Sequence, residues 1–285
     1  MTVKTSKLLA SDGAVIPTQT GPRPVKLTID ALTKRFPLRR GEALTAVEAV
    51  SFDVHEYETV ALLGPSGCGK STILRIIAGL ETPSDGEVRL DGHRVAGPGR
   101  DRGMVMQSYT SFPWLNVRQN VEYGLRVNGV PRAIRSARAE YFLDLVKLGR
   151  FKSAYPDTLS GGMRQRVAIA RTLANQPSVL LMDEPFGALD AETRWHMQEL
   201  LAEIVRMHKM TLVLVTHDLE EAIFLADRIV FLSAGPGRVH EILPTDFKRE
   251  QEVKTKEDML AAPGYTELES HLMTLMRTMA RSEDE

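Results

Sequence analysis

The order of apolar and polar positions along the chain predicts alternating strands and helices. Residues 25–29 and 50–54 alternate between apolar and polar side chains, which is typical of half-buried strands, and residues 37–41 form a loop between them. Continuous apolar runs predict strands that are buried on both faces. They lie at residues 59–63, 104–106, 179–182, 211–215 and 228–232. Because helical stretches separate several of these runs, we expect an α/β fold with a mostly parallel sheet covered on both faces.

Several stretches have the spacing of helices. Residues 72–78 follow the first buried run, and residues 191–208 form a longer helical stretch between two others. From about residue 108 to 159, apolar residues recur at helical spacing among many arginines, and we interpret this segment as an inserted helical subdomain. Near the C-terminus, a stripe at spacings of mostly three and four predicts an amphipathic helix. The stripe consists of Tyr265, Leu268, Leu272, Leu275, Met276 and Met279.

These patterns divide the chain into three parts. Residues 1–24 are rich in Ser, Thr, Gly and Pro and are expected to form a flexible tail. Residues 25–246 form the main domain. Residues 247–285 form a C-terminal extension, and we expect its amphipathic helix to pack on the main domain rather than to regulate it.

Composition narrows the function. The chain has 285 residues, and its 36 basic and 37 acidic residues nearly cancel, which argues against a nucleic-acid partner held by a basic surface. Its one cysteine, Cys68, excludes an internal disulfide and fits a reducing cytosol. No apolar run reaches the roughly 20 residues that span a bilayer, and the N-terminal residues lack the apolar core of a secretion signal. We therefore expect a cytoplasmic protein without a transmembrane segment.

One segment matches the phosphate-binding pattern G-x-x-x-x-G-K-[ST], between a buried strand and a helix. It consists of Gly64, Pro65, Ser66, Gly67, Cys68, Gly69, Lys70, Ser71 and Thr72. Backbone N–H groups of such a loop surround phosphates, while Lys70 can reach the outer phosphates and the Ser71 hydroxyl can bind Mg²⁺. A glycine-rich turn with a chance lysine is the alternative, and the order of strand, loop and helix argues against it. Cys68 lies near a helix N-terminus, so we expect a thiolate whose alkylation blocks activity.

Two further segments carry candidate chemistry. The run at 179–182 ends in Asp183 and Glu184, where Asp183 can hold Mg²⁺ and Glu184 can polarise an attacking water. Ser160 is a candidate N-cap, and Gly161 and Gly162 leave backbone N–H groups free at the helix start to bind a second anion. A strand that ends in Asp-Glu is weak evidence alone but strong evidence after a phosphate loop. For the second segment a simple capped helix is the alternative, and the presence of two anion-binding helix starts in one chain argues against it.

Together these segments resemble an ATP-binding cassette ATPase over residues 25–243. The resemblance rests on the phosphate loop, Gln107, residues 159–163, Asp183 with Glu184, residues 188–190 and His217. It implies a P-loop, RecA-like core with an antiparallel β part and a helical subdomain. It also implies a head-to-tail homodimer or pseudo-dimer, with each ATP between one phosphate loop and the partner's Ser160, Gly161 and Gly162.

The resemblance also implies roles for single residues. Phe36 would stack on adenine, and Gln107 would contact Mg²⁺ and the region of the attacking water. Glu184 would be the general base, Asp190 would cross the dimer interface, and His217 would contact the γ-phosphate. A histidine at a strand end with only structural partners is the alternative for His217.

A finer resemblance is to the ATPases of nitrate, taurine and aliphatic-sulfonate importers. Residues 113–117, 120–121 and 233–238 carry it. It implies a membrane permease as partner, an indirect partner in an extracytoplasmic solute-binding protein, and a place at the cytoplasmic face of the membrane. Two positions depart from the wider family, because Met163 replaces a usual Gln and Tyr57 precedes Glu58 where Gly is usual.

Two alternatives remain open. Soluble cassette ATPases of translation usually have two cassettes and those of DNA repair a long coiled coil, whereas this chain has one phosphate loop and a short path from Lys70 to Leu159. The second alternative, a P-loop small-molecule kinase, leaves residues 159–163 and His217 unexplained.

An apolar cluster follows Gln107, and Pro113 disfavours a helix there. The cluster is either an interface with the permease or a contact that packs the helical subdomain against the core. It comprises Tyr109, Phe112, Pro113, Trp114 and Leu115.

Overall fold

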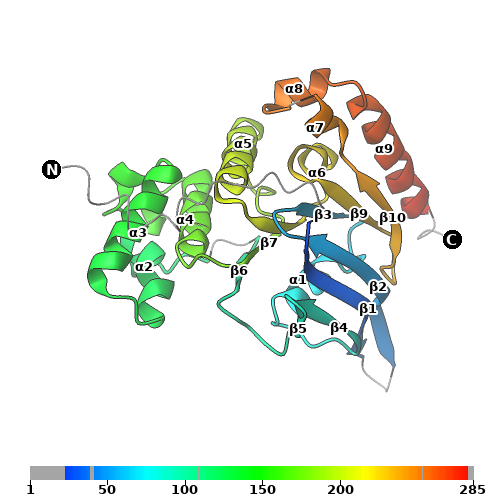
Figure 1. Ribbon diagram of the computed structural model, residues 1–285, viewed down its shortest axis with the longest axis horizontal. Coiled ribbons are helices and arrows are strands. Elements are labelled where there is room, and N and C mark those ends of the chain that lie inside the picture. Colours follow the sequence, from blue (N-terminus) through cyan, green and yellow to red (C-terminus); the bar gives the residue numbers. More distant parts are fainter. Residues whose placement is uncertain (1–22, 39–41, 108–109, 252, 282–285) are drawn as a thin grey trace. The chain divides into compact units, whose positions relative to one another are not determined.

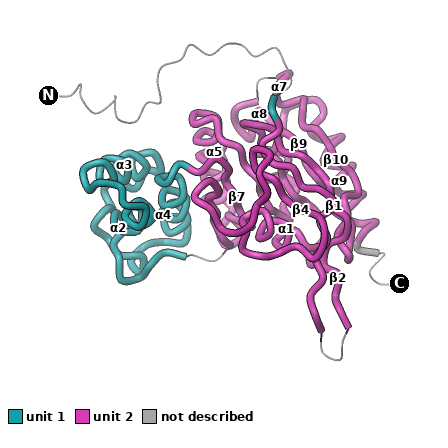
Figure 2. Tube along the Cα trace, turned by 60° about the horizontal axis from the view of Figure 1, so that its bottom comes forward, with its two compact units in different colours: residues 1–24, 109–176 teal, residues 25–108, 177–285 magenta. Residues whose placement is uncertain are grey.

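The computed structural model describes residues 23–38, 42–107, 110–251 and 253–281. Most of the predicted N-terminal tail therefore lies outside the described residues. The described chain forms two compact units, shown in different colours in Figure 2. The helical unit contains residues 109–176, and the larger unit contains residues 25–108 and 177–285.

The larger unit is built on a six-stranded sheet in the order β10-β9-β3-β8-β7-β6. Neighbours from β9 to β6 pair in parallel, and only β10 is antiparallel (Figure 1). The strands are β3 (Thr59–Leu63), β6 (Arg102–Val105), β7 (Val179–Asp183), β8 (Thr211–Val215), β9 (Arg228–Leu232) and β10 (Val239–Pro244). The mostly parallel sheet expected from the apolar runs is thus confirmed, whereas the edge strand β10 had not been predicted.

A second, antiparallel sheet has the order β2-β1-β4-β5. Its strands are β1 (Val25–Pro37), β2 (Ala43–His55), β4 (Asp85–Leu90) and β5 (His93–Arg94). Helix α1 (Lys70–Ile77) packs against both β2 and the parallel strands β7 and β8. Val60 and Leu62 of β3 share one core with α1 and the antiparallel sheet. Ala61 and Leu63 point to the opposite face and are equally buried, so both faces of the parallel sheet are covered.

Two helices follow the central strands of the larger unit. They are α5 (Ala191–His208), with the predicted bounds, and α6 (Leu219–Leu225). Both begin with aspartate N-caps. The carboxylate of Asp190 accepts from the backbone N–H of Thr193 at 2.9 Å, and that of Asp218 accepts from Glu221 at 3.1 Å.

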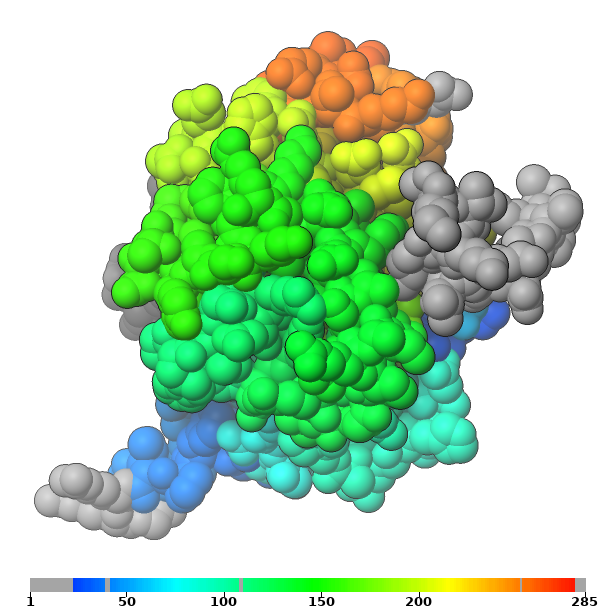
Figure 3. Space-filling view, turned by 90° about the vertical axis from the view of Figure 1, so that its left-hand side faces the viewer, coloured from blue at the N-terminus to red at the C-terminus, as the bar shows by residue number. Residues whose placement is uncertain are grey.

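The helical unit is a small bundle whose surface Figure 3 shows in green. It contains α2 (Val117–Val127), α3 (Arg132–Leu145), the 3-10 turns η3 (Gly149–Phe151) and η4 (Pro156–Thr158), and α4 (Gly161–Leu173). The unit continues to Gln176, beyond the expected limit at residue 159, because α4 packs against both α2 and α3. Asn116 caps α2 in a reciprocal pair of hydrogen bonds with Gln119.

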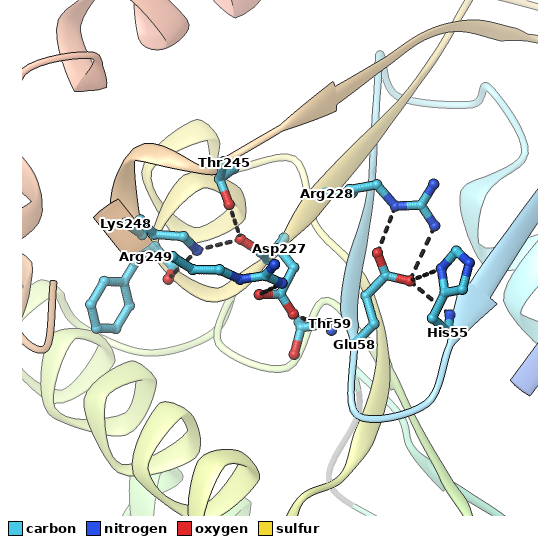
Figure 4. Close-up of polar contacts among 10 residues, drawn as sticks. His55, Glu58, Thr59, Asp227, Arg228, Thr245, Lys248 and Arg249 are labelled. Carbon is cyan, nitrogen blue, oxygen red and sulfur yellow. Dashed lines mark hydrogen bonds and ion pairs between the residues drawn. The ribbon is translucent and has the colours of Figure 1, made fainter. Parts of the chain in front are cut away.

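The turn into β3 shows how the chain accommodates Tyr57 at a position where the family usually has glycine. Tyr57 has a φ of 60°, a left-handed conformation that glycine adopts at lower cost. The Glu58 carboxylate next to it accepts from Arg228 Nε at 2.6 Å and from the backbone N–H of His55 at 2.7 Å (Figure 4). These contacts keep the turn in place although residue 57 is not glycine.

The C-terminal extension and Thr245, just before it, are bonded to the end of α6 and to Asp227, just before β9. The Thr245 hydroxyl donates to the carbonyl of Ala226 at 2.5 Å, and Lys248 Nζ donates to that of Phe224 at 3.0 Å. Arg249 pairs with Asp227 at 2.9 Å, and Asp227 also accepts from the backbone N–H of Thr59 (Figure 4). The extension is therefore bonded to the start of the central strand.

Three helices make up this extension: α7 (Phe247–Glu250), α8 (Lys256–Ala261) and α9 (Tyr265–Arg281). The predicted amphipathic helix is α9, which packs its stripe against α6 and α8 (Figure 1). Lys256 of α8 is buried, forms an ion pair with Glu220, and lies 5.0 Å from the ring centre of Trp195. Across the described ranges, no helix combines the length and apolar character that crossing a bilayer requires.

Candidate functional site

The predicted phosphate loop connects the buried strand β3 to α1. Gly69 has a φ of 90°, and a Cβ there would lie 2.5 Å from Val47 Cγ2, so the loop needs glycine at this position. Lys70 Nζ donates to the carbonyls of Gly64 at 2.8 Å and Pro65 at 2.6 Å. The ammonium group is thereby held inside the loop, where it can meet phosphate oxygens.

Residues at the tip of the phosphate loop are exposed to solvent, whereas residues at its base are buried. Ser66 and Gly67 are exposed, whereas Pro65 and Lys70 are buried. Ser71 and Thr72, at the start of α1, are half-buried. This is the arrangement that an anion approaching the loop from solvent requires.

The structure contradicts the prediction that Cys68 is a reactive thiolate. Its side chain is fully buried in the core between α1 and the two sheets, so burial raises the pKa of the thiol, an effect that the neighbouring Lys70 only partly offsets. A helix N-terminus alone lowers a thiol pKa, but here desolvation has the larger effect. Cys68 is a small core residue turned into the protein and not a reactive thiolate.

Ser71 and Asp183 meet at the base of the loop. The Ser71 hydroxyl donates to Asp183 Oδ1 at 2.7 Å. Asp183 is the last residue of β7 and is buried. A hydroxyl and a carboxylate oxygen are hard donors of the kind that Mg²⁺ prefers, so these two residues fit this ion.

Gln107 and His217 converge on one carboxylate oxygen of Glu184. Gln107 Nε2 donates to Glu184 Oε2 at 3.1 Å, and His217 Nδ1 lies 3.2 Å from the same oxygen. Glu184 has a φ of 44°, which is uncommon for a residue with a side chain and is concentrated at functional sites. Its backbone N–H donates to the carbonyl of Val215 at 2.9 Å and so fixes this conformation against β8. Three residues far apart in the sequence are thus brought to one point.

A small pocket opens beside this point. It is lined by Glu184, Gly187, Arg194, Thr216, His217, Asp218 and Glu221. Sequence reasoning had identified only Glu184 and His217 among these residues. The other five lie within a few positions of the predicted motifs in the sequence, and this closeness was the signal by which they could have been found.

Glu221 is a buried carboxyl in the wall of this pocket. Burial and the nearby Asp218 carboxylate raise the pKa of Glu221 to about 8. Its Oε2 accepts from Nε2 of the buried Gln198 at 3.1 Å. Within the described residues, Oε1 of Glu221 and Oε1 of Gln198 have no other hydrogen-bond partner. A protonated Glu221 can donate to the Gln198 oxygen and satisfy both atoms, so α5 and α6 are linked by a neutral pair.

The remaining predicted residues lie outside this cluster. Phe36 is a half-buried residue of β1, with Lys34 Nζ 4.9 Å from its ring centre. Asp190 caps α5, and its hydrogen bond with Thr193 lowers the pKa of the carboxyl. The Ser160 hydroxyl accepts from the backbone N–H of Met163 at 3.3 Å and caps α4, with Gly161 and Gly162 in the first turn. Ser160, Gly161 and Gly162 belong to the helical unit and not to the unit that contains the phosphate loop.

Known proteins resemble this chain closely. The family model described as ABC transporter matches residues 47–187. The nitrate import ATP-binding protein NrtD of Synechocystis sp. is 49% identical over 226 residues, which cover 79% of this chain and 85% of that protein. The taurine import ATP-binding protein TauB of Burkholderia pseudomallei is 47% identical over 260 residues, which cover 91% and 99%. A dimeric post-hydrolysis state of an ATP-binding cassette, bound to ADP and Pi, matches with 35% identity and a TM-score of 0.68, covering 77% of this chain and 98% of that one.

The parallel sheet, the phosphate loop and the carboxylates at the end of β7 define a P-loop nucleotide hydrolase. The chain belongs to the ABC transporter ATPase family. The resemblance inferred from the motifs, including its nitrate and taurine branch, is confirmed. The alternatives of a soluble translation or repair ATPase and of a small-molecule kinase are not favoured.

Proposed function

We propose that this chain is the ATP-hydrolysing subunit of an importer that drives uptake of a small solute, such as nitrate, taurine or another sulfonate, through a membrane permease. The observation that carries the catalytic part is the convergence of Gln107 and His217 on Glu184, beside Ser71 and Asp183. The two import proteins that cover most of this chain support the transport part.

Binding of the nucleotide is assigned to one face of the larger unit. The phosphate loop, from Gly64 to Thr72, surrounds the phosphates with backbone N–H groups and the Lys70 ammonium group, while Phe36 stacks on adenine. Ser71, Asp183 and Gln107 are the residues that would hold Mg²⁺. When bound, the ion neutralises charge on the β- and γ-phosphate oxygens.

Hydrolysis is assigned to Glu184 as general base. Its carboxylate accepts a proton from water as the water oxygen bonds to the γ-phosphorus and the bond to the β-phosphate oxygen breaks, which yields ADP and phosphate. His217 contacts the γ-phosphate and, with Gln107, holds the carboxylate in position. The hydrogen bond from Gln107 and the contact with His217 are both made to Oε2, which leaves Oε1 of Glu184 for the water.

A second copy, or a similar cassette, completes the site in this proposal. Its Ser160, Gly161 and Gly162 bind the γ-phosphate from the opposite side, because the start of α4 carries free backbone N–H groups. Asp190 crosses the interface between the two cassettes. The dimeric ATP-binding cassette of similar fold supports this arrangement.

The partner in the membrane is a permease, and an extracytoplasmic solute-binding protein delivers the solute to it. This chain then lies at the cytoplasmic face of the membrane. The exposed Trp114, in the loop before α2, is the candidate contact with a cytoplasmic segment of the permease. Closure of the ATP-bound dimer moves the helical units, and the permease follows.

Glu184→Gln tests the catalytic assignment. The variant is expected to bind MgATP normally, to lose about 10²–10⁴-fold in turnover, and to accumulate as an ATP-bound dimer. Phosphate release, nucleotide binding and size-exclusion chromatography measure these properties. Glu199→Gln is the matched control, because the Glu199 carboxylate accepts from Trp195 Nε1 and Glu199 is not among the residues that line the pocket. Normal turnover in Glu184→Gln would exclude Glu184 as the base.

Reconstitution with the permease tests the transport assignment. Vesicles that contain the permease, this chain and the solute-binding protein should accumulate labelled nitrate, taurine or sulfonate only with ATP on the side of this chain. Vesicles assembled with Glu184→Gln are the control. ATP hydrolysis that never couples to uptake of any of these solutes would favour a cassette ATPase of another kind.

A further inference from the structure

One arginine connects two segments that enter the candidate site from different strands. Arg194, in the first turn of α5, donates from Nη2 to the carbonyl of Leu189 at 2.9 Å. Leu189 precedes Asp190, the N-cap of the same helix. The segment that leads from Glu184 to α5 is therefore held at its end by the arginine side chain.

The same guanidinium group faces the segment that carries His217. Arg194 Nη1 lies 3.6 Å from Oδ2 of Asp218, the residue directly after His217. The Oδ1 atom of Asp218 caps α6 by accepting from the backbone N–H of Glu221. The backbone N–H of Asp218 donates to the Thr216 hydroxyl at 3.0 Å. The two carboxylate oxygens of Asp218 thus contact different groups: Oδ1 caps α6, and Oδ2 faces Arg194.

This contact is better suited to position groups than to stabilise the fold. About a third of each side chain remains exposed, with 33% for Arg194 and 29% for Asp218, so solvent screens the ion pair. The guanidinium group, however, is planar and offers donors in fixed directions: Nη2 donates to Leu189 on one segment, while Nη1 faces the carboxylate of Asp218 on the other as an ion pair. Arg194 also lines the pocket that Glu184 and His217 share.

We propose that Arg194 is a positioning residue for ATP hydrolysis. It holds the segment that ends in Asp190 and the segment that begins at His217 in one fixed relation, with Glu184 at the start of the first segment. In the dimer, where Asp190 crosses to the partner cassette, a displacement at that interface is transmitted through Arg194 and Asp218 to His217. This inference rests on the roles proposed above for Glu184, Asp190 and His217.

Two conservative substitutions test the connection. Arg194→Lys keeps the charge but has no second planar donor, and Asp218→Asn keeps an oxygen for the α6 cap but removes the charge that faces Arg194. Each is expected to lower kcat by about 10-fold or more, because small displacements in an active site are costly. Both should leave binding of a nonhydrolysable MgATP analogue to the monomer, measured at low protein concentration, within about twofold, since the phosphate loop is untouched.

The double variant and a control decide between positioning and general damage. Because both substitutions break one connection, Arg194→Lys with Asp218→Asn should lose little more kcat than either alone. Arg249→Gln removes another arginine–aspartate pair of the larger unit, that with Asp227, and should leave kcat unchanged. Multiplicative losses in the double variant, unchanged kcat in both single variants, or a fall in kcat that follows the melting temperature would each overturn the proposal.

Failure of the base assignment would look different. In that case Glu184→Gln would retain turnover, while the comparison of Arg194 and Asp218 variants would still report whether the two residues act together. A sharper readout is dimerisation in the Glu184→Gln background. Arg194→Lys should raise the MgATP concentration needed for half-maximal dimer formation by several-fold, and an unchanged concentration would contradict the proposed transmission to the interface.

Discussion

The Ser71 hydroxyl donates to Asp183 Oδ1 across 2.7 Å, although the two residues are 112 positions apart. Ser71 lies in the first turn of α1, the helix after the phosphate loop, and Asp183 is the last residue of β7. The contact exists because β3 and β7 both pair with β8 in parallel, so their carboxyl ends reach the same edge of the sheet. Two oxygens that we propose as ligands of Mg²⁺ are thereby held next to the phosphate loop.

Ser71→Ala should weaken binding of MgATP by about 10-fold, because it removes one oxygen of the candidate metal set. Binding of ATP in the presence of EDTA should change little, since the phosphate loop and Lys70 remain. Calorimetry with and without Mg²⁺ measures both. Ser84→Ala, in the antiparallel part, is a matched control that should change neither. An equal loss with and without Mg²⁺ would assign Ser71 to the phosphates instead.

Cys68 should resist alkylation in the folded protein. Its thiol is buried and its pKa is raised, so both access and the thiolate fraction are low. We expect iodoacetamide to leave ATPase activity intact over hours and to react rapidly once the protein is unfolded in urea. Because Cys68 is the one cysteine of the chain, mass spectrometry reports its modification directly. Fast labelling of the native protein that MgATP prevents would restore the reactive thiolate expected from the sequence.

Much of the fold and of the candidate site was predictable because both depend on local patterns. Apolar runs identify strands that are buried on both faces, and the predicted bounds of β3, β8, β9 and α5 match the structure. The phosphate loop was recognisable because its backbone shape requires glycine at defined spacing. Asp183 and Glu184 could be placed because residues at the carboxyl ends of parallel strands share one edge.

Other features depend on tertiary contacts that no local pattern reveals. The turn at 233–238 looked like a marker of the importer branch, but in the structure it also packs against the phosphate loop. A Cβ on Gly237 would lie 1.9 Å from the carbonyl oxygen of Cys68, and the Gly237 carbonyl accepts from the backbone N–H of Glu48 at 2.9 Å. Likewise, the competition between desolvation and helix dipole at Cys68 could be decided only once its burial was known.

Glu221 should make stability depend on pH. An unfolded glutamate loses its proton near pH 4.5, whereas folded Glu221 keeps it to about pH 8, so the folded state binds more protons between these values. The free energy of unfolding should therefore fall as pH rises through this window, and the full contribution is present only below it. Each unit of pKa shift corresponds to about 1.4 kcal/mol.

Glu221→Gln tests this dependence. A glutamine can keep a hydrogen bond with Gln198 and never ionises, so the variant should be more stable than the wild type at pH 8 and should have a flatter stability profile between pH 5 and 8. The charges that face Glu221 are Asp218, Arg194 and Lys256, and all three remain. Urea unfolding across this range is the measurement. Glu203→Gln, at an exposed position of α5, is the control. A parallel profile for wild type and Glu221→Gln would show that the carboxyl is ionised in the fold.

We expect Trp114 to be an interface residue and not a residue that packs the helical unit against the core. Its side chain is 70% exposed in the loop before α2, its ring centre lies 5.5 Å from that of Phe112, and Tyr109 of the same predicted cluster lies outside the described residues. Phe112 does contact the helical unit, because its ring centre is 4.4 Å from that of Tyr123. The cluster is thus divided, with Phe112 against the unit and Trp114 facing solvent.

Trp114→Ala should therefore leave the melting temperature and basal ATPase activity nearly unchanged while it weakens binding to the permease and uptake by the assembled importer. A buried tryptophan would instead cost about 3–5 kcal/mol of stability. Val127→Ala is the matched control, because Val127 lies in α2 of the same unit and is 68% exposed. It should affect neither stability nor transport. Thermal unfolding, copurification with the permease and uptake are measured on the same preparations. A large fall in melting temperature for Trp114→Ala, or uptake equal to that of Val127→Ala, would remove Trp114 from the interface.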